Sequence, residues 1–540
     1  MRRLVDVLVG IFLAAAPTAL HAQSAPLPRV AHSAGKHALI VDGQPFLMLG
    51  AQANNSSNYP AVLPQVWPVI RQIHANTLEI PVAWEQIEPQ EGRFDFSWVD
   101  ALIPQARANN VRLVLLWFGT WKNTGPSYTP ECVKSDPKRF SRMMTRDGKT
   151  HYVLSPHARS TLDADKRAFA ALMRHIREVD AQHTVIMVQV ENETGSYGSP
   201  RDFSPAAQRL FAEPIPAELA RKVGKSGVWT QVFGAKADQA FNAWYTGRYV
   251  DEVAAAGQAE LNLPMYVNAA LSNPFKESDA QYSASGGPNW NVIDIWKAAA
   301  PHVALLAPDI YDRDDKIYLR QLDNYARADN ALFVPETGNA LEYSRFLWAA
   351  LGKGAIGWSP FGMDATGYSN YPLGAKTLDA DTLEAFASKY ALFAPIAREW
   401  ARLAFEHPTW GAVRPADGSD QSGVLGRWRI TTQYGQWQFG EKDATWIKTD
   451  PNPNNDRPVG GAAVIQLGPD EFLVAGSDVR VRLALANATP GENVQFVDVE
   501  EGTFENGPWR MARRWNGDQT DYGLNLTRPT LLKVRMGTYR

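Results

Sequence analysis

Residues 184–195 read TVIMVQVENETG, an apolar run that ends abruptly in polar and acidic residues. The hydrophobicity of residues 185–188 is continuous rather than alternating, as in a parallel-sheet strand that is covered on both faces. Seven similar segments alternate with amphipathic stretches over roughly 360 residues. They are residues 46–50, 77–84, 112–118, 264–269, 303–310, 331–335 and 355–358. Eight strand and helix units predict an α/β fold, the (β/α)8 TIM barrel.

One connecting helix and one insertion are also visible. Phe169, Leu172, Met173 and Ile176 recur at helical spacing within residues 168–179. The longest insertion follows the fourth strand, over residues 194–231, where four prolines interrupt regular structure. We expect this insertion to overhang the top of the barrel.

The pattern changes after residue 395. Short alternating segments separated by turn residues predict an antiparallel β-sandwich; they are residues 424–432, 434–439, 462–467, 472–475, 479–485 and 494–499. We therefore expect a barrel over residues 23–395 and a C-terminal all-β sandwich domain over residues 396–540.

Residues 1–22 are typical of a secretory signal peptide. Arg2 and Arg3 precede an apolar run at residues 7–16, and small residues follow at 19–22. About ten apolar residues are too few to cross a hydrocarbon layer of ~30 Å. We expect a periplasmic or secreted protein with no membrane attachment once the signal is removed.

Composition excludes several functions. The chain has 540 residues, with 54 Lys and Arg against 57 Asp and Glu, so it lacks the basic excess of a nucleic-acid-binding protein. The single cysteine, Cys132, rules out an intramolecular disulfide. The ten histidines show no metal-ligand spacing. Neither a metal nor a cofactor is expected, and the 18 tryptophans are compatible with surfaces on which sugar rings stack.

Two glutamate-bearing strings directly follow predicted strands. Glu191-Asn192-Glu193 ends the fourth strand and Glu336 ends the seventh. A carboxylate at the end of an apolar strand is costly to desolvate unless something pairs with it. Active sites of such barrels lie at the carboxyl ends of the strands. Because strands four and seven face each other across the barrel, their glutamates predict a paired acid and nucleophile.

Glu191 competes with Glu193 for the acid position. In strict alternation both side chains lie on the same side of the strand, so a bend at its end must decide which one enters the cleft. The distance to Glu336 also matters. About 5 to 5.5 Å between the carboxyls permits direct attack on a sugar carbon, whereas a wider gap admits water and inverts the configuration.

Several strings resemble the retaining (β/α)8 glycoside hydrolases, most closely glycoside hydrolase family 35, the β-galactosidases. They are QVENETG at residues 189–195, PETG at 335–338, VDGQPF at 41–46, ANT at 75–77 continuing to Trp84, EP at 88–89 and EGRFDF at 91–96. The resemblance spans roughly residues 38–365. It implies that Glu193 is the general acid/base, Glu336 the nucleophile, and Asn192 the residue that holds the sugar 2-hydroxyl. The charge of Glu336 is expected to raise the pKa of Glu193.

Three further residues are candidate substrate-binding residues, each with an alternative. Tyr311, after the sixth strand, either donates a hydrogen bond to Glu336 or is a packing tyrosine. Trp358, at the end of the eighth strand, either stacks on a sugar face or fills the core. Glu88, which matches the Glu-Pro pair of the family, either contacts substrate or pairs with a nearby base.

The chain departs from family 35 where that family binds galactose. Pro81 and Glu85 stand on the second strand where the family commonly has Tyr and Asn. After the third strand, residues 119–123, including Lys122, replace the family's Cys-Ala-Glu-Trp. The expected function is a retaining exo-β-glycosidase acting on an oligosaccharide, most directly a β-galactosidase. The alternatives are the same chemistry on a glucoside, mannoside or glucosaminide, and a carbohydrate-binding barrel without activity.

Overall fold

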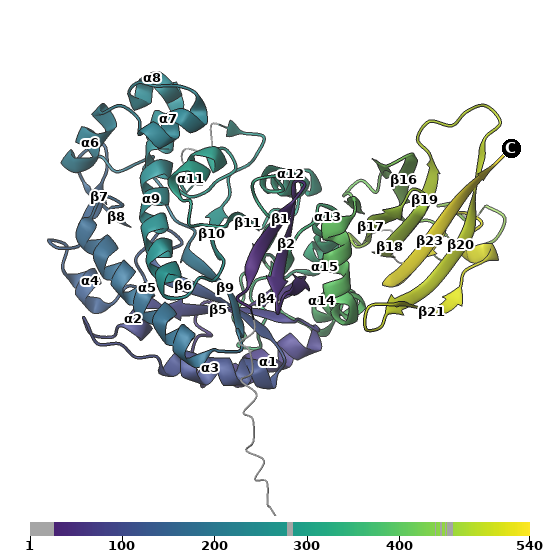
Figure 1. The fold of residues 1–540 in the computed structure, drawn as a ribbon, viewed down its shortest axis with the longest axis horizontal. Helices are drawn as coiled ribbons and strands as arrows, with labels where there is room; N and C mark the ends of the chain where they lie inside the picture. Colours follow the sequence, from purple (N-terminus) through teal and green to yellow (C-terminus); the bar gives the residue numbers. More distant parts are fainter. Residues whose placement is uncertain (1–25, 278–283, 438, 443–444, 449, 451–456) are drawn as a thin grey trace, which may run out of the picture.

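The computed structural model describes residues 26–277, 284–437, 439–442, 445–448, 450 and 457–540 (Figure 1). The predicted signal peptide, residues 1–22, lies outside the described residues. Within them, no helix combines the length and the apolar character needed to span a bilayer.

Eight parallel strands close into a barrel in the order β10-β11-β12-β13-β4-β5-β6-β9. Each of the eight predicted segments contributes one strand, which confirms the TIM-barrel prediction. The strands are β4 (Met48–Gln52), β5 (Thr77–Ala83), β6 (Arg112–Lys122), β9 (Val185–Asn192), β10 (Met265–Ala270), β11 (Leu305–Ile310), β12 (Phe333–Thr337) and β13 (Gly357–Pro360). The main helices around them are α1 (Leu63–Gln72), α3 (Ser97–Ala108), α5 (Arg159–Val179), α9 (Ala237–Glu260), α11 (Ile293–Ala299), α12 (Asp315–Tyr325), α13 (Phe346–Gly352) and α14 (Ala380–Phe393).

The barrel is filled and closed at the N-terminal end of its strands. A three-stranded antiparallel sheet, β1 (Arg29–Ser33), β2 (Lys36–Val41) and β3 (Gln44–Phe46), leads directly into β4. Leu39 and Val41 of β2 pack with interior side chains such as Leu116, Ile186 and Phe333 in one buried cluster. Since this end is closed by apolar packing, only the carboxyl ends of the strands are left to form a site.

The insertion after β9 folds into three short helices, α6 (Pro205–Ala212), α7 (Ala217–Val223) and α8 (Trp229–Phe233). Ser204 caps α6 by accepting a hydrogen bond from the Ala207 amide, and Pro205 occupies the first helical turn. Tyr197, at the start of the insertion, lines a cavity at the carboxyl ends of the strands. The insertion therefore reaches the top of the barrel, as expected.

The C-terminal region is an antiparallel sandwich, which confirms the predicted class. One sheet has the order β14-β17-β18-β23-β20-β21 and the other β15-β16-β19-β22. Their bounds are β14 (Thr409–Val413), β15 (Gln421–Leu425), β16 (Trp428–Gln433), β17 (Gly461–Gly468), β18 (Glu471–Ser477), β19 (Val479–Leu485), β20 (Asn493–Phe504), β21 (Trp509–Arg514), β22 (Leu524–Leu526) and β23 (Thr530–Tyr539). Trp428, Val464, Phe472 and Leu524 are among the residues buried between the two sheets.

Two of the predicted C-terminal strands were wrong in detail. Residues 424–432 form the hairpin of β15 and β16 rather than one strand, because Gly426 adopts a φ of 57° and reverses the chain. In residues 434–439, the described positions form no strand. Gly435 has a φ of 67°, which turns the backbone out of an extended conformation.

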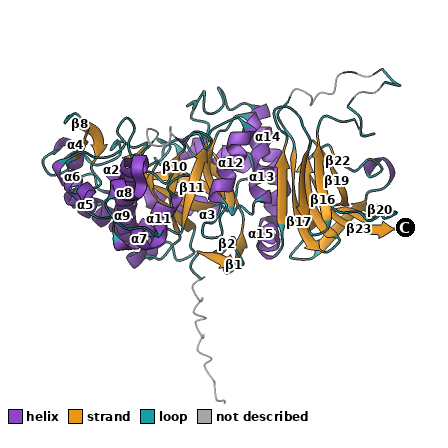
Figure 2. Cartoon of the chain, turned by 90° about the horizontal axis from the view of Figure 1, so that it is seen from above, coloured by secondary structure: helices purple, strands orange, loops and turns teal. Residues whose placement is uncertain are grey.

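The sandwich docks on the barrel through α13 and α15 (Ala397–Glu406), which lie between the two parts in Figures 1 and 2. Ile465 and Leu473 of the six-stranded sheet share a hydrophobic cluster with Leu347 and Trp348 of α13. Contact is close enough to require glycine: a Cβ atom on Gly411 of β14 would lie 2.4 Å from the Trp348 carbonyl oxygen. Within the six-stranded sheet, β17 and β18 are thus buried on both faces.

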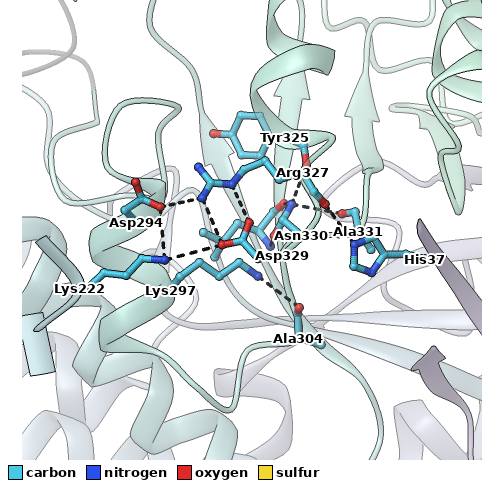
Figure 3. Close-up of polar contacts among 11 residues, drawn as sticks. His37, Lys222, Asp294, Lys297, Ala304, Tyr325, Arg327, Asp329, Asn330 and Ala331 are labelled. Carbon is cyan, nitrogen blue, oxygen red and sulfur yellow. Dashed lines mark hydrogen bonds and ion pairs between the residues drawn. The ribbon is translucent and has the colours of Figure 1, made fainter. Parts of the chain in front are cut away.

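A polar network joins the turn before β12 to neighbouring elements (Figure 3). One part of this network is exposed to solvent and the other part is buried. On the exposed side, Arg327 pairs with Asp294 and Asp329 at 2.7 Å. On the buried side, Asn330 accepts a hydrogen bond from the Leu306 amide at 2.8 Å and donates to the Leu306 carbonyl at 2.9 Å. It also donates to the Tyr325 carbonyl at 3.0 Å. Asn330 therefore ties this turn to the start of β11.

We expect Asn330→Ala to lower the free energy of unfolding by about 3 kcal/mol, because buried backbone groups lose their partners. Asp329→Asn is the matched control, since its exposed ion pairs contribute only about 0 to 1 kcal/mol. Urea denaturation followed by tryptophan fluorescence measures both. Equal midpoints for Asn330→Ala and wild type would contradict the structural role of Asn330.

Candidate active site

Three carboxyl groups converge at the carboxyl ends of β9, β11 and β12. One oxygen each of Glu193, Asp309 and Glu336 lies within 4.8 Å of the other two. An approach this close is compatible with direct attack by one carboxyl, as in retaining glycosidases, whose carboxyl groups lie roughly 5–5.5 Å apart. Glu193 and Asp309 line a cavity of about 600 Å³ together with Tyr197 and Tyr311. The two glutamates singled out from the sequence therefore meet in one cleft.

A bend at the end of β9 decides between Glu191 and Glu193. Both residues adopt positive φ values, 64° and 44°, so the alternation of an extended strand is broken. Glu191 turns into the buried layer next to Asp165, where the Trp121 amide donates to its Oε2 at 2.7 Å. Glu193 is left as the glutamate in the cleft. The Asn268 side chain holds it there by accepting a hydrogen bond from its amide at 2.9 Å.

The surroundings of Glu193 suit a proton donor. Burial, followed by the charge of Glu336, raises the pKa of Glu193 to about 7, although the charge of Lys122 acts in the opposite direction. A carboxyl with such a pKa holds its proton at mildly acidic pH and can release it to a leaving group. The expected influence of Glu336 on Glu193 is therefore present.

Glu336 has different surroundings. The Gln52 amide donates to its Oε2 at 3.1 Å, and the Tyr311 hydroxyl donates to its Oε1. These hydrogen bonds fix the orientation of the Glu336 carboxyl group. The contact between Tyr311 and Glu336 is the one expected from the sequence.

Asn192 is buried and its side-chain amide has no hydrogen-bond partner among the described residues. Its backbone pairs with Lys122 at the end of β6, at the carboxyl end of the barrel. Buried amides are normally satisfied, so the Asn192 amide is suited to bind a hydroxyl group of a ligand.

The structure contradicts a substrate contact for Trp358. Its side chain is buried against Phe386 and Tyr390, and its Nε1 donates to the Tyr318 hydroxyl at 3.0 Å. The residue points outward from β13 into the helical layer. Core filling, the alternative given above, is correct.

Glu88 is likewise not a substrate contact. It is buried at the end of α2 (Trp84–Ile87). Its oxygens accept hydrogen bonds from Trp84 Nε1 at 2.8 Å and the Gly92 amide at 2.7 Å, and Arg167 pairs with it at 3.1 Å. These contacts saturate the carboxylate, so the alternative of pairing with a nearby base is correct.

Only one of the three departures from family 35 lies near the carboxyl groups. Lys122 ends β6, pairs in register with Asn192 and is buried. Glu85 instead forms a partly exposed ion pair with Lys134 at 2.7 Å. Pro81 lies within the buried β5, and its carbonyl accepts a hydrogen bond from Trp98 at 3.0 Å.

Sequence reasoning missed Gln52, Asn268 and Asp309. Each is a polar residue in or at the end of an apolar barrel strand, on β4, β10 and β11 respectively. The same signal that identified Glu193 and Glu336 was therefore present, but these residues do not belong to the compared strings. Oxygen-rich clusters of this kind also attract hard cations. Here Gln52, Tyr311 and Asn268 donate hydrogen bonds to the carboxyls, which indicates proton chemistry.

A second cavity, of about 860 Å³, lies at the opposite end of the barrel and is bordered by Phe504 of the sandwich. Arg112 and Arg398 line it, and both pair with Asp42 at 2.7 Å. Arg402 pairs with Glu399 at 2.5 Å. Because its charged groups satisfy one another, this cavity lacks the reactive surroundings of the first.

Two families match parts of the chain. Residues 63–255 match glycoside hydrolase family 42, described as β-galactosidase, and residues 386–527 match a domain of unknown function, DUF5597. The matching β-galactosidase family is therefore family 42, and the expectation of family 35 was wrong. Three of the compared strings, at residues 75–77, 88–89 and 91–96, and QVENETG at 189–195 lie inside the stretch that matches family 42, so these strings did not separate one family from the other.

Individual relatives align over short stretches. β-Galactosidase BgaA of Thermus sp is 26% identical over 155 residues, which cover 28% of this chain and 22% of that protein. The β-galactosidase of Thermus thermophilus is 25% identical over 163 residues, covering 29% of this chain and 24% of that protein. The chain thus aligns with less than a quarter of the length of either relative.

Two solved structures are also similar. The β-galactosidase of the psychrophilic Marinomonas ef1 gives a TM-score of 0.48 at 12% identity, covering 67% of this chain and 62% of that one. The cold-adapted β-galactosidase of Rahnella sp. R3 gives 0.45 at 13% identity, covering 67% and 61%.

We expect Glu336→Gln to lower the pKa of Glu193 from about 7, because a negative charge that opposes its ionisation is removed. The carboxyl infrared band, titrated against pH, measures the change, with Glu193→Gln as the reference that lacks the group. Glu85→Gln, on the surface, is the control that leaves the titration unchanged. A Glu193 pKa that stays the same or rises in Glu336→Gln would contradict the coupling.

Proposed function

We propose that the protein is a retaining exo-β-glycosidase, most directly a β-galactosidase that releases terminal β-D-galactosyl residues from oligosaccharides. The observation that carries the proposal is the approach of Glu193 and Glu336 to within 4.8 Å, with the pKa of Glu193 raised to about 7 and the Glu336 carboxyl oriented by hydrogen bonds. The similarity of residues 63–255 to β-galactosidases supports galactose as the sugar.

In the first half-reaction, the Glu336 carboxylate attacks the anomeric carbon while Glu193 gives its proton to the glycosidic oxygen. The bond to the leaving alcohol breaks and a glycosyl ester forms on Glu336. Gln52 and Tyr311 orient the attacking carboxylate through their hydrogen bonds. The Asn192 amide holds the sugar 2-hydroxyl, a contact that strengthens in the transition state.

In the second half-reaction, Glu193 takes a proton from water, the water oxygen attacks the anomeric carbon, and Glu336 is released as a carboxylate. Esterification removes the negative charge of Glu336, which is one cause of the raised pKa of Glu193. The pKa of Glu193 therefore falls when this residue has to act as a base. One carboxyl group serves both steps.

The second candidate is the same chemistry on another sugar. It is favoured by Lys122, a buried cation that pairs with Asn192 in the register of the sheet. A cation there changes which hydroxyl groups the cleft accepts. The two candidate functions therefore differ in the sugar that is bound and share the same mechanism.

We expect Glu336→Ala to reduce turnover of a nitrophenyl β-galactoside by about 10⁴-fold or more, because the nucleophile is lost. A 2-fluoro-galactoside carrying a good leaving group should inactivate the wild type, and mass analysis of peptides should find the label on Glu336. Unchanged behaviour of Glu336→Ala would support the non-catalytic barrel instead. A label on any other residue would contradict the assignment of the nucleophile.

A panel of nitrophenyl glucosides, mannosides, glucosaminides and galactosides completes this test. Turnover of another sugar without turnover of the galactoside would overturn the β-galactosidase proposal but leave the retaining mechanism in place.

We expect kcat/KM to fall as the pH rises through about 7, because Glu193 then loses the proton that it must donate. The decrease should approach about tenfold per pH unit above that value. A substrate whose leaving group needs no protonation is the control, since its glycosylation step should keep its rate to higher pH. An activity that increases above pH 7 would contradict the role of Glu193 as acid.

A further inference from the structure

Asp309 is a third carboxyl in the cleft, and neither the sequence comparison nor the mechanism above gives it a role. It lies on β11 directly beside Glu336 in the register of the sheet and is 3% exposed. Its Oδ2 accepts a hydrogen bond from the Asn268 amide at 2.7 Å. Its Oδ1 is buried without a hydrogen-bond partner among the described residues. Its carboxyl approaches both glutamates to within 4.8 Å.

Asn268 fixes the orientation of Asp309 relative to Glu193. Its Oδ1 accepts from the Glu193 amide at 2.9 Å and its Nδ2 donates to Asp309 Oδ2 at 2.7 Å. One side-chain amide therefore binds both residues and uses one oxygen of Asp309. Only the other oxygen, Oδ1, remains for an interaction with a neighbouring carboxyl.

The charges in the cleft do not allow all three carboxyls to ionise. Several titratable groups face Asp309 from the surrounding elements. The charged ones are Glu193, Glu336, Glu79 on β5 and Lys122 on β6. The tyrosines are Tyr266 on β10, Tyr311 directly after β11, Tyr197 after β9 and Tyr325 at the end of α12. Lys122 is the one cation among them, and its ammonium group already binds Asn123. Carboxylates this close together keep at least one proton between them.

That proton belongs on Asp309. Burial and the charges of Glu336 and Glu193 raise the pKa of Asp309 well above its ordinary value. The pKa of Glu193 is raised only to about 7. Glu336 accepts two hydrogen bonds, from Gln52 and Tyr311. Asp309 has one hydrogen-bond donor for its two oxygens, so its Oδ1 is suited to carry a proton.

We propose that Asp309 stays neutral in the working enzyme and donates a hydrogen bond from Oδ1 to the Glu193 carboxyl. The inference deepens the proposed function and rests on it for its kinetic consequences. Asp309 is a positioning residue: it keeps its proton throughout, while Glu193 gives one proton to the leaving oxygen and recovers one from water. The Asp309 hydroxyl stabilises the Glu193 carboxylate that exists between these two transfers.

Asp309→Asn and Asp309→Ala test the inference through the pH profile. Asparagine still accepts from Asn268 and donates to Glu193, so the basic limb should stay near pH 7, while kcat falls by about threefold because an amide is the weaker donor. Alanine removes the donor, so the basic limb should move to higher pH, and kcat should fall by about tenfold or more. Were Asp309 ionised, both variants would move the limb to lower pH, which would overturn the proposal.

An infrared difference spectrum at pH 8 separates this inference from the proposed function, because it needs no turnover. The wild type should show the C=O stretching band of a protonated carboxyl that Asp309→Asn lacks. Glu85→Gln, an exposed carboxyl outside the cleft, should leave the band in place. Absence of the band from the wild type would overturn the inference even for an active enzyme. The band without hydrolysis of any glycoside would instead leave Asp309 neutral and refute the glycosidase proposal.

Discussion

Two carboxyl groups held within 4.8 Å of each other repel unless their surroundings give them different charges. The closed barrel imposes this proximity, because β9 and β12 end at the same rim and their side chains project into one interior. The difference in charge then comes from the neighbours. Glu336 receives hydrogen bonds from Gln52 and Tyr311, whereas Glu193 is buried beside a negative charge and has its pKa raised to about 7. Acid and nucleophile are thus distinguished by environment and not by residue type.

The bend at the end of β9 turns this proximity into a usable geometry. An extended strand would place Glu191 and Glu193 on one side and bring a further carboxyl into an already crowded cleft. The positive φ values of both residues send Glu191 into the layer between the barrel and α5, next to Asp165. Non-glycine residues adopt such angles only where the surroundings hold them. Here the Trp121 amide holds Glu191 and the Asn268 side chain holds the Glu193 amide.

The periodicity of the sequence was sufficient to predict the eight barrel strands and the sandwich class, because continuous and alternating hydrophobicity report directly on which faces of a strand are buried. Periodicity also located Glu193 and Glu336, since a polar residue at the end of an apolar strand can be recognised from the sequence alone. What it did not give was the direction of a side chain at a strand end. Trp358 turns into the helical layer, and Glu88 is saturated by local donors. The position of Trp358 depends on Tyr318, which is distant in sequence, and Arg167 adds a distant partner to the local donors of Glu88.

The polar groups described above differ in their hydrogen-bond partners between the two ends of the barrel. At the N-terminal end, Asn330 satisfies the backbone of β11, and Arg112 and Arg398 share Asp42. At the carboxyl end, the Asn192 amide and Asp309 Oδ1 are buried without partners among the described residues. Leaving such groups unpaired costs stability, and a ligand or a shared proton can offset that cost. A sugar hydroxyl at Asn192 and a proton between Asp309 and Glu193 would supply both, which places recognition and proton transfer at the same end of the barrel.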